Sequence, residues 1–312
     1  KQLVHLNAET ACRHVFLLPK KHTTLSAGTC TWWTQPQDPL LRLTTRLAIT
    51  QPVNFALLAN SSEEAFGIAT LGNSRGFHKH EKNGSISIDY RESFGQNAFD
   101  ARYPNTFSIP HASSVHWSSH ATGTPPWALP ESPRHNLMLF LGSTGHGDTA
   151  VRDQITSQCH RYENSSSAIC VMASYQNESS LLLMRNSTFC LQPGGDNPAR
   201  KSLIDSITFG CIPVIFSPLT DMLQPWFWDS WREMGRVLVP REEFVHGSYD
   251  LHQRLSSISR THVTAMRKAI ADHAQKFQIS IEDDPNDAVS NILSHVHSRC
   301  LAQSVTTRSE AH

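Results

Sequence analysis

The sequence predicts an α/β fold with a parallel sheet in its C-terminal half, and three observations support this. Short apolar runs such as Leu137–Leu141 are typical of strands buried on both faces. From about residue 135 onward these runs alternate with stretches of helical periodicity, which is the pattern of strand–helix units with right-handed crossovers. A proline-rich stretch at 118–133 resists both helix and strand, and it separates this half from a less regular one.

The elements of the C-terminal half follow in order. After the strand at Leu137–Leu141, a helix is expected where Val151, Ile155 and Cys159 recur every four residues. We then expect strands at Ala168–Met172, Thr188–Leu191, Cys211–Phe216 and Arg236–Val239, with helical segments at Leu181–Met184 and Pro198–Phe209. Pro213 favours an edge strand or a bulge. Two terminal helices are expected, one with Val263, Met266, Ile270 and Phe277 on one face and one with Val289, Ile292, Leu293 and Val296.

The N-terminal hundred residues are poorly patterned. Short strands are expected at Val15–Leu18, Leu47–Ile49 and Phe55–Leu58, a short helix at Ser62–Ala69, and a loop over 72–87. We therefore predict a partial or diverged N-terminal domain at 1–120, a crossing at 121–134, a C-terminal domain with its terminal helices at 135–297, and a tail at 298–312.

Composition excludes several classes of protein. The 312 residues are 39% hydrophobic, and 27 Lys and Arg balance 27 Asp and Glu. This balance lacks the basic footprint of a nucleic-acid binder and the charge excess of a disordered chain. The longest apolar runs fall far short of the roughly 20 residues that span a bilayer. The 18 histidines have no evident reason.

Glycosylation sequons favour a secretory lumen. Five N-x-[ST] motifs occur, at Asn60, Asn83, Asn164, Asn177 and Asn186. The seven cysteines form no C-x-x-C pair, so zinc-ribbon and thioredoxin-like motifs are unsupported. The chain begins at Lys1 rather than Met, and we interpret it as a piece of a longer product whose targeting segment lies elsewhere.

The segment from Ser187 to Phe216 has the pattern strand, glycine turn, helix, strand. Gly194 and Gly195 allow a tight turn and close approach to a ligand, Asp196 or Asn197 is expected to cap the helix, and Pro198 suits its first position. The helix N-terminus then directs free amides toward the carboxyl edge of the sheet, where nucleotides bind in such folds.

Two cations in the first turn of this helix oppose its dipole unless an anion is present. Arg200 and Lys201 therefore indicate a diphosphate, and Asp205 is a candidate acceptor for a ribose or sugar hydroxyl. The alternative from spacing alone is a solvated Lys201–Asp205 pair on an ordinary helix.

The same segment resembles the signature of the exostosin family, glycosyltransferase family 47. The matching positions are Phe189, Cys190, Leu191, Pro193, Gly195, Asp196, Pro198, Arg200, Lys201, Asp205, Ser206, Ile207 and Gly210–Ile215. Outlying segments are also similar to the family: Arg134–Gly142 followed by Arg152, Thr106–His111 with Trp117, and Trp226–Trp231. The resemblance covers roughly 104–297.

This resemblance implies an inverting, metal-independent glycosyltransferase of GT-B architecture, with a Rossmann-like C-terminal nucleotide-binding domain. Such an enzyme takes a nucleotide sugar, usually a UDP-sugar, and needs no cofactor. It extends a glycan or glycoprotein acceptor in the Golgi as part of a membrane-anchored full-length protein, and a homo- or hetero-oligomer is a further expectation. The nucleotide-sugar site that it implies comprises Arg134, Gly142, Arg152, Gly194, Gly195, Asp196, Pro198, Arg200, Lys201 and Asp205.

Departures from the family pattern keep a second hypothesis open. Ala199 and Asn197 stand where Ser or Thr is usual, and residues 1–100 lack the family's W-x-R…G-x-D-H element. The alternative is therefore a catalytically inactive exostosin-fold protein that binds a nucleotide sugar, a glycan or a partner glycosyltransferase.

The remaining candidates each have a plainer interpretation. His111 is a candidate general base, although surface histidines are the commoner case, and its spacing to His116 and His120 is not a metal pattern. The loop Gly142–Asp148 lies at another strand end and is a candidate for the same cleft. The acidic stretch Glu282–Asp287 is expected to cap the last helix. Sequence leaves open whether Trp226, Trp228 and Trp231 stack on a ligand or form core, and whether Cys190 and Cys211 are thiols or a disulfide.

Overall fold

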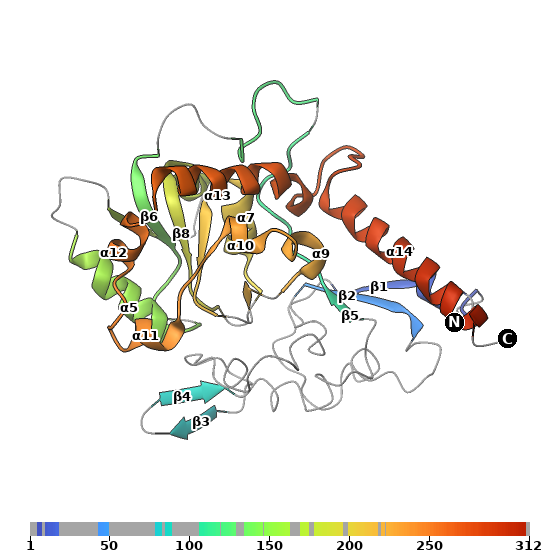
Figure 1. The fold of residues 1–312 in the computed structure, drawn as a ribbon, viewed down its shortest axis with the longest axis horizontal. Coiled ribbons are helices and arrows are strands. Elements are labelled where there is room, and N and C mark those ends of the chain that lie inside the picture. The colour runs from blue at the N-terminus through green and yellow to red at the C-terminus, as the bar shows by residue number, and fades with distance from the viewer. Residues whose placement is uncertain are drawn as a thin grey trace.

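The computed structural model describes part of the chain (Figure 1), namely residues 5–7, 10–18, 43–49, 79–82, 85–88, 106–118, 120–128, 134–145, 147–162, 169–174, 178–195, 199–217, 220–221 and 223–309. The strand expected at Phe55–Leu58 and the helix expected at Ser62–Ala69 lie outside these residues, as do the candidate site residues Asp196 and Pro198.

A five-stranded parallel sheet forms the centre of the C-terminal half. Its strands are β6 (Asn136–Leu141), β7 (Cys170–Ala173), β8 (Ser187–Gln192), β9 (Ile212–Ile215) and β10 (Val237–Leu238). They lie in the order β7-β6-β8-β9-β10, and every pair is parallel. The five predicted strands and the parallel α/β class are therefore confirmed.

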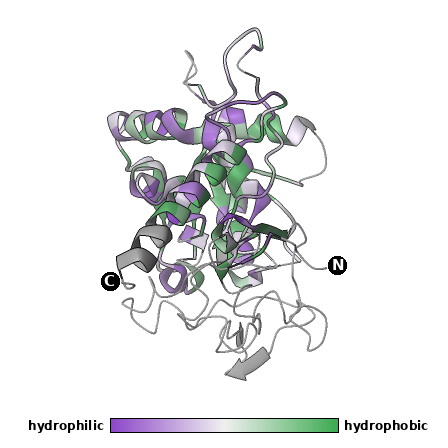
Figure 2. Ribbon diagram, turned by 90° about the vertical axis from the view of Figure 1, so that its right-hand side faces the viewer, coloured by the Kyte–Doolittle hydropathy of each residue, from purple (hydrophilic) through white to green (hydrophobic). Residues whose placement is uncertain are grey.

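The apolar runs end up in the interior, as continuous hydrophobic strands of a parallel sheet should. All four residues of β9 are buried, as are five of the six residues in each of β6 and β8. Figure 2 shows green, hydrophobic segments in the middle of the molecule and helices along which purple and green residues alternate. Pro213 does not lie on an edge strand, which corrects the sequence prediction. It is tolerated because β10 pairs with β9 only from Val214 onward, so that Pro213 pairs with Cys190 of β8 alone.

Three helices connect the first four strands: α5 (Thr149–His160), α6 (Glu178–Asn186) and α7 (Lys201–Thr208). Val151, Ile155 and Cys159 of α5 are all buried, as their spacing predicts. Beyond the sheet come α9 (Pro225–Trp228), α10 (Arg232–Gly235), α11 (Arg241–Val245), α12 (Leu251–Ser256), α13 (Arg260–His273), the 3-10 turn η4 (Ala274–Phe277) and α14 (Ala288–Ser309).

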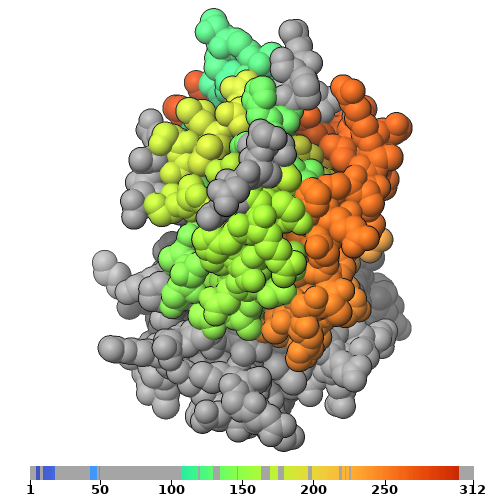
Figure 3. Space-filling view, turned by 90° about the vertical axis from the view of Figure 1, so that its left-hand side faces the viewer, coloured from blue at the N-terminus to red at the C-terminus, as the bar shows by residue number. Residues whose placement is uncertain are grey.

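Figure 3 shows α5 beside the orange segment that carries α11 and α12. Polar contacts hold this side together, because Gln158 of α5 donates to the Tyr249 carbonyl at 2.8 Å and accepts from the Leu251 amide at 2.9 Å. The first turn of α5 is tied to α11 by a buried ion pair between Asp148 and Arg241.

The two terminal helical faces have different outcomes. Met266, Ile270 and Phe277 are buried and confirm the first face. Of the four residues expected on the second face only Val296 is buried, whereas Val289 and Leu293 are exposed, so these four do not form a single buried stripe. The expected cap is present, since Asp287 accepts a hydrogen bond from the Ser290 amide at 2.9 Å.

The tryptophans after β9 are largely core residues. Trp228 and Trp231 are buried, and their indole nitrogens donate to the carbonyls of Leu223 and Phe227. Trp226 is partly buried and stacks on Phe107 with ring centroids 4.3 Å apart. The core interpretation therefore holds for the buried pair.

The described N-terminal segments form a smaller parallel sheet. Its strands are β1 (Val15–Leu18), β2 (Thr45–Ala48) and β5 (Thr106–Ser108), in the order β1-β2-β5. A separate antiparallel hairpin pairs β3 (Lys79–Lys82) with β4 (Ser85–Ile88), so the loop prediction for 72–87 is wrong over these residues. The polar composition concealed an Asn83–Gly84 dipeptide, a strong hairpin-turn signal, before the alternating Ile86 and Ile88.

Leu47 and Phe107 of the small sheet belong to the same hydrophobic cluster as the large sheet. The domain limits at residues 120, 134 and 297 stay predictions, and α14 continues past the last of them to Ser309. None of the helices in the described part of the chain is long and apolar enough to span a membrane.

Two disulfides brace the large sheet. Cys190 of β8 is bonded to Cys211, which precedes β9, and this resolves the alternative that the sequence leaves open. Cys159 of α5 is bonded to Cys170 of β7, a pairing that the sequence analysis did not identify. Because disulfides persist in oxidising compartments, both are consistent with a secretory lumen.

Candidate functional site

The candidate site lies at the point where the strand order of the large sheet reverses. Numbered along the chain, the five strands have the order 2-1-3-4-5, and the reversal falls between β6 and β8. In open parallel sheets, ligands bind in the crevice outside the carboxyl ends of the strands at such a switch point. The segments that leave these two strands are 142–148 and 193–200, which contain most of the predicted site residues.

These two segments are in direct backbone contact. The Asp148 amide donates to the Gly194 carbonyl at 3.1 Å. Gly147 has a positive φ of 78°, and a Cβ at this position would lie 2.5 Å from the Gly194 oxygen and 2.9 Å from the Gly195 Cα. Only glycine fits there, because a side chain would require both the left-handed conformation and a displaced turn. The expectation that Gly142–Asp148 belongs to this edge is confirmed in position.

Arg152 forms hydrogen bonds to both segments and so connects them. Its Nε and Nη2 donate to the Gly194 carbonyl at 3.3 and 3.1 Å, and its Nη1 donates to the Ser143 carbonyl. The guanidinium also lies over the Phe140 ring, 5.6 Å from its centroid. Arg152 therefore positions the Gly194–Gly195 turn, and it brings a positive charge to the switch point.

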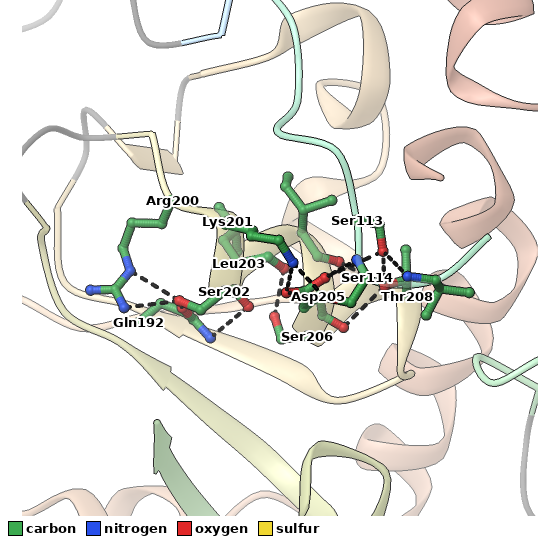
Figure 4. Close-up of polar contacts among 12 residues, drawn as sticks. Ser113, Ser114, Gln192, Arg200, Lys201, Ser202, Leu203, Asp205, Ser206 and Thr208 are labelled. Atoms are coloured by element: carbon green, nitrogen blue, oxygen red, sulfur yellow. Dashed lines mark hydrogen bonds and ion pairs between the residues drawn. The ribbon is translucent and has the colours of Figure 1, made fainter. Parts of the chain in front are cut away.

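Arg200 connects the segment that contains Gly194 and Gly195 to the first turn of α7 (Figure 4). Its Nη1 donates to the Pro193 carbonyl, and its Nε and Nη2 donate to the Ser202 hydroxyl at 3.1 and 2.8 Å. That hydroxyl in turn donates to Gln192 Oε1 at 2.7 Å. The carboxyl end of β8 is thus bonded to the first turn of α7 through side chains.

Helix α7 starts later than the sequence predicts. Its first residue is Lys201 and its N-cap is Arg200, whose side chain makes no capping hydrogen bond. Asp196 or Asn197 is therefore not the cap and Pro198 does not occupy the first helical position, which corrects both expectations. The physical reason is that Arg200 is extended, with φ of −129° and ψ of 131°, so the helical conformation cannot begin before it. The first amides of α7 thus have no side-chain cap from Arg200.

Lys201 and Asp205 meet one turn apart on α7 and hold the segment that follows β5 (Figure 4). Lys201 Nζ lies 2.6 Å from Asp205 Oδ2 and also donates to the Ser114 hydroxyl. Asp205 Oδ1 accepts from the Ser114 amide at 2.6 Å and from the Ser113 hydroxyl at 3.3 Å. The pair is therefore not simply a solvated one, because it fastens residues 113–114 to the helix.

Burial sets the electrostatics of this pair. Asp205 is fully inaccessible, and desolvation raises the pKa of its carboxyl to about 6, although the hydrogen bonds from Ser113 and Ser114 oppose the shift. Desolvation also lowers the pKa of Lys201, whose side chain remains 40% exposed. The ammonium is accessible at this edge, whereas the carboxylate is committed to interior contacts.

Arg134 lies at the opposite edge of the sheet. It precedes β6, and its guanidinium donates to the carbonyls of Met184, Ser187 and Phe209 at 2.6, 2.7 and 2.9 Å. These carbonyls belong to the end of α6, the start of β8 and the end of α7. Burial is the main cause that lowers the pKa of Arg134 to about 9. The structure therefore does not bring Arg134 together with Arg152, Arg200 and Lys201.

The histidines of the 106–120 segment do not form a common site in the structure. His116 Nδ1 lies 2.8 Å from the Ile279 carbonyl, and the His120 amide donates to the Ser118 hydroxyl. His111 is partly buried, two residues before Ser113. No group of three His, Cys, Asp or Glu side chains that could hold a metal occurs among the residues that the structure describes.

Sequence reasoning missed four residues of the site, namely Ser113, Ser114, Gln192 and Ser202. It included Asp148 only as the last residue of the loop Gly142–Asp148 and missed its contacts. Asp148 accepts a hydrogen bond from Val151 at the start of α5 and forms a bidentate pair with Arg241 at 2.8 and 3.0 Å. An Asp directly before a helix is a recognisable cap signal. Ser113 and Ser114 bond Asp205, and Asp148 bonds Arg241, in each case about 90 residues away in the chain. No local sequence pattern predicts such contacts.

A parallel sheet connected by helices, with glycine turns and cations at its switch point, defines a protein of the open α/β class, in which ligand sites form at that point. The family can be named more closely, because residues 70–255 match the Exostosin GT47 domain. This match covers more than half of the chain, and the chain belongs to that family.

Its relatives are glycosyltransferases. The chain is similar to the probable xyloglucan galactosyltransferase GT12 of Arabidopsis thaliana, with 29% identity over 62% of this chain and 41% of that protein. It is also 36% identical to the xyloglucan-specific galacturonosyltransferase 1 of Arabidopsis thaliana over 38% of this chain and 19% of that protein. The chain spans less than half the length of either relative.

Similarity to solved structures is distant. The pneumococcal O-GlcNAc transferase GtfA in complex with UDP and GlcNAc aligns at a TM-score of 0.35 and 10% identity, over 88% of this chain and 54% of that one. The rhamnosyltransferase SpnG with spinosyn aglycone aligns at a TM-score of 0.31 over 58% of this chain and 51% of that one. This likeness is too low to define the fold further.

Proposed function

We propose that this chain is the nucleotide-sugar-binding part of a glycosyltransferase of GT-B architecture that transfers a sugar from a UDP-linked donor to a glycan. The observation that carries the proposal is the meeting of the Gly194–Gly195 turn, the loop 142–148 and the start of α7 at the switch point between β6 and β8. Membership of the Exostosin GT47 family supports sugar transfer over other nucleotide chemistry.

The electrostatics of this edge suit a diphosphate. The amide end of α7 carries the positive end of the helix dipole, and Arg200 and Lys201 add two cations at that end. A diphosphate leaving group develops negative charge as the sugar departs, and fixed positive groups stabilise that charge most effectively when they need no rearrangement. We assign this role to Arg200, to Lys201 and to the first amides of α7.

We further propose that the transfer inverts the anomeric configuration and needs no metal ion. The acceptor hydroxyl would attack the anomeric carbon from the face opposite the diphosphate, and a general base would take its proton. His111 is our candidate for that base, because it lies on the segment that Asp205 and Lys201 fasten to α7. The protein's own cations would then supply the counter-charge that a metal provides elsewhere.

The names of the relatives suggest the acceptor and the compartment. Both relatives above are named as enzymes of xyloglucan, one as a galactosyltransferase and one as a galacturonosyltransferase. We propose a xyloglucan-type acceptor and residence in the Golgi lumen. The two disulfides and five sequons support the lumenal setting.

A transfer assay tests the proposal. The chain, secreted from a eukaryotic host, is incubated with xyloglucan oligosaccharides and either UDP-galactose or UDP-galacturonic acid, with and without EDTA, and products are followed by mass spectrometry. We expect one hexose or hexuronic acid to be added equally with and without EDTA. NMR should show that the anomeric configuration of the new linkage is opposite to that of the donor sugar. UDP binding without transfer to any acceptor would instead support the catalytically inactive alternative, and loss of transfer in EDTA would contradict metal independence.

A further inference from the structure

Two cysteines in the described part of the chain take no part in the disulfides of the large sheet. They are Cys12, in the 3-10 turn η1 (Ala11–Arg13), and Cys300, in α14. Both are buried, and together with Val296 they form a small hydrophobic cluster apart from the main core. Nearly the whole length of the chain separates them, and yet η1 packs on α14, the last helix of the chain (Figure 1).

The two thiols are direct neighbours. The Cys12 side chain is a direct neighbour of the Cys300 thiol within this buried cluster. Burial, as the largest cause, raises the pKa of the Cys300 thiol far above its usual range. A disulfide needs two cysteines whose side chains face each other, and two neighbouring buried thiols meet that condition.

The rest of the chain indicates the redox setting in which this pair folds. The structure contains the disulfides Cys159–Cys170 and Cys190–Cys211, and such bonds form and persist only where the surroundings are oxidising. Two adjacent thiols that fold in the same compartment meet the same oxidants.

We propose that Cys12 and Cys300 form a third disulfide in the mature protein. The bond forms by thiol–disulfide exchange with an oxidising disulfide, either glutathione disulfide or a disulfide of a folding catalyst. The thiolate of one cysteine attacks that disulfide and releases one thiol, and the other cysteine then displaces the second thiol. Two S–H bonds of the chain are lost and one S–S bond forms, while the oxidant gains two electrons and two protons.

The crosslink would join two segments that both contact the small sheet. On the N-terminal side, the Cys12 carbonyl accepts a hydrogen bond from the Thr45 hydroxyl of β2 at 3.2 Å. On the C-terminal side, the Arg299 guanidinium lies 4.3 Å from the Phe107 ring centroid of β5. A Cys12–Cys300 bond would therefore hold α14 across the small sheet, and closing so long a loop restricts the unfolded chain strongly.

Helix α14 reaches the large sheet's surroundings as well. Asn291 donates to the Trp226 carbonyl of α9 at 3.0 Å, and His295 stacks on the Trp226 ring at 5.1 Å. The first half of α14 is bonded to the segment after β9, and the proposed disulfide would attach its second half to η1. The bond would therefore help to fix the position of the small sheet relative to the large one.

Peptide mapping of the secreted wild-type chain is the first test. Non-reducing digestion with alkylation at low pH is expected to yield a linked peptide pair that contains Cys12 and Cys300, and reduction should separate it. The proposal is overturned if both cysteines are recovered as alkylated monomers, or if either is linked to Cys30. This measurement needs no variant and cannot fail through misfolding.

Thiol counting gives an independent number. Cys30→Ser removes the seventh cysteine, and the denatured, unreduced chain should then react with no maleimide; two equivalents would contradict the bond. Adding Cys12→Ser should raise the count from zero to one by releasing Cys300. In the same background Cys12→Ser and the double variant Cys12→Ser/Cys300→Ser should lower the melting temperature by nearly the same few degrees. Additive losses would indicate two packed thiols rather than one bond.

Discussion

Replacing Gly147 with alanine should disable the candidate site through the backbone alone. A Cβ at this position would lie 2.5 Å from the Gly194 carbonyl oxygen and 2.9 Å from the Gly195 Cα, and φ is 78°. An alanine in this conformation costs about 1–2 kcal/mol before any contact is considered. The overlap with Gly194 then forces the glycine turn or the loop 142–148 to move, because the obstructing atoms are backbone atoms.

We expect Gly147→Ala to lower the free energy of unfolding by about 2–4 kcal/mol and to weaken UDP binding at least about tenfold, which corresponds to about 1.4 kcal/mol. Chemical denaturation measures the first quantity and isothermal titration calorimetry the second. Displacement of the turn would break the Asp148–Gly194 hydrogen bond and shift the carbonyl that Arg152 holds.

Gly145 supplies a matched control in the same loop. It is exposed, and a Cβ there would meet nothing within 4 Å. Gly145→Ala should therefore change UDP affinity less than about twofold and stability by no more than about 0.5 kcal/mol. The reasoning is refuted if Gly147→Ala binds UDP as tightly as the wild type, or if both variants lose affinity equally.

Three other substitutions test individual contacts. Asp205→Asn should remove a pH dependence, because burial raises the Asp205 pKa to about 6. The stability that its protonation provides is fully present below about pH 4 and is lost as pH rises through about 6. Urea unfolding should show the wild type falling relative to the variant by about 2 kcal/mol from pH 4 to 7, and parallel profiles would contradict this. Arg134→Met should cost about 3 kcal/mol because three carbonyls lose their donor, while UDP affinity in the folded fraction stays within twofold of wild type; a large loss of affinity would restore Arg134 to the site. A double-mutant cycle of Asp148→Asn with Arg241→Met should give a coupling energy of at least about 1.5 kcal/mol for their buried pair, and a value near zero would show that the pair contributes nothing.

Local patterns predicted the large sheet well. A continuous apolar run predicts a strand that is covered on both faces, independently of the rest of the chain. All five predicted strands formed within two residues of their expected limits. The hairpin at Lys79–Ile88 was missed because its residues are polar enough to resemble a loop. The start of α7 was displaced because an extended Arg200, bonded to Pro193 and Ser202, outweighed the cap and proline signals before it.

The candidate site was predictable only where position along a strand decides the edge. Gly142 follows β6 and Gly194 follows β8, so both had to lie at the carboxyl edge of a parallel sheet. Arg134 precedes β6 and had to lie at the other edge, although its family motif suggested a phosphate-side cation. The contacts of Asp205 with Ser113 and Ser114 join segments about 90 residues apart, and only the folded chain brings them together.

The central claim is that a nucleotide diphosphate binds at the start of α7. Calorimetric titration of UDP into the wild type, Arg200→Ala and Arg254→Ala tests it most directly, because Arg254 is an exposed arginine of α12 and its loss changes the net charge equally. We predict binding by the wild type, affinity within twofold for Arg254→Ala, and at least tenfold weaker binding for Arg200→Ala. No UDP binding by the wild type, or equal affinity in all three proteins, would contradict the claim.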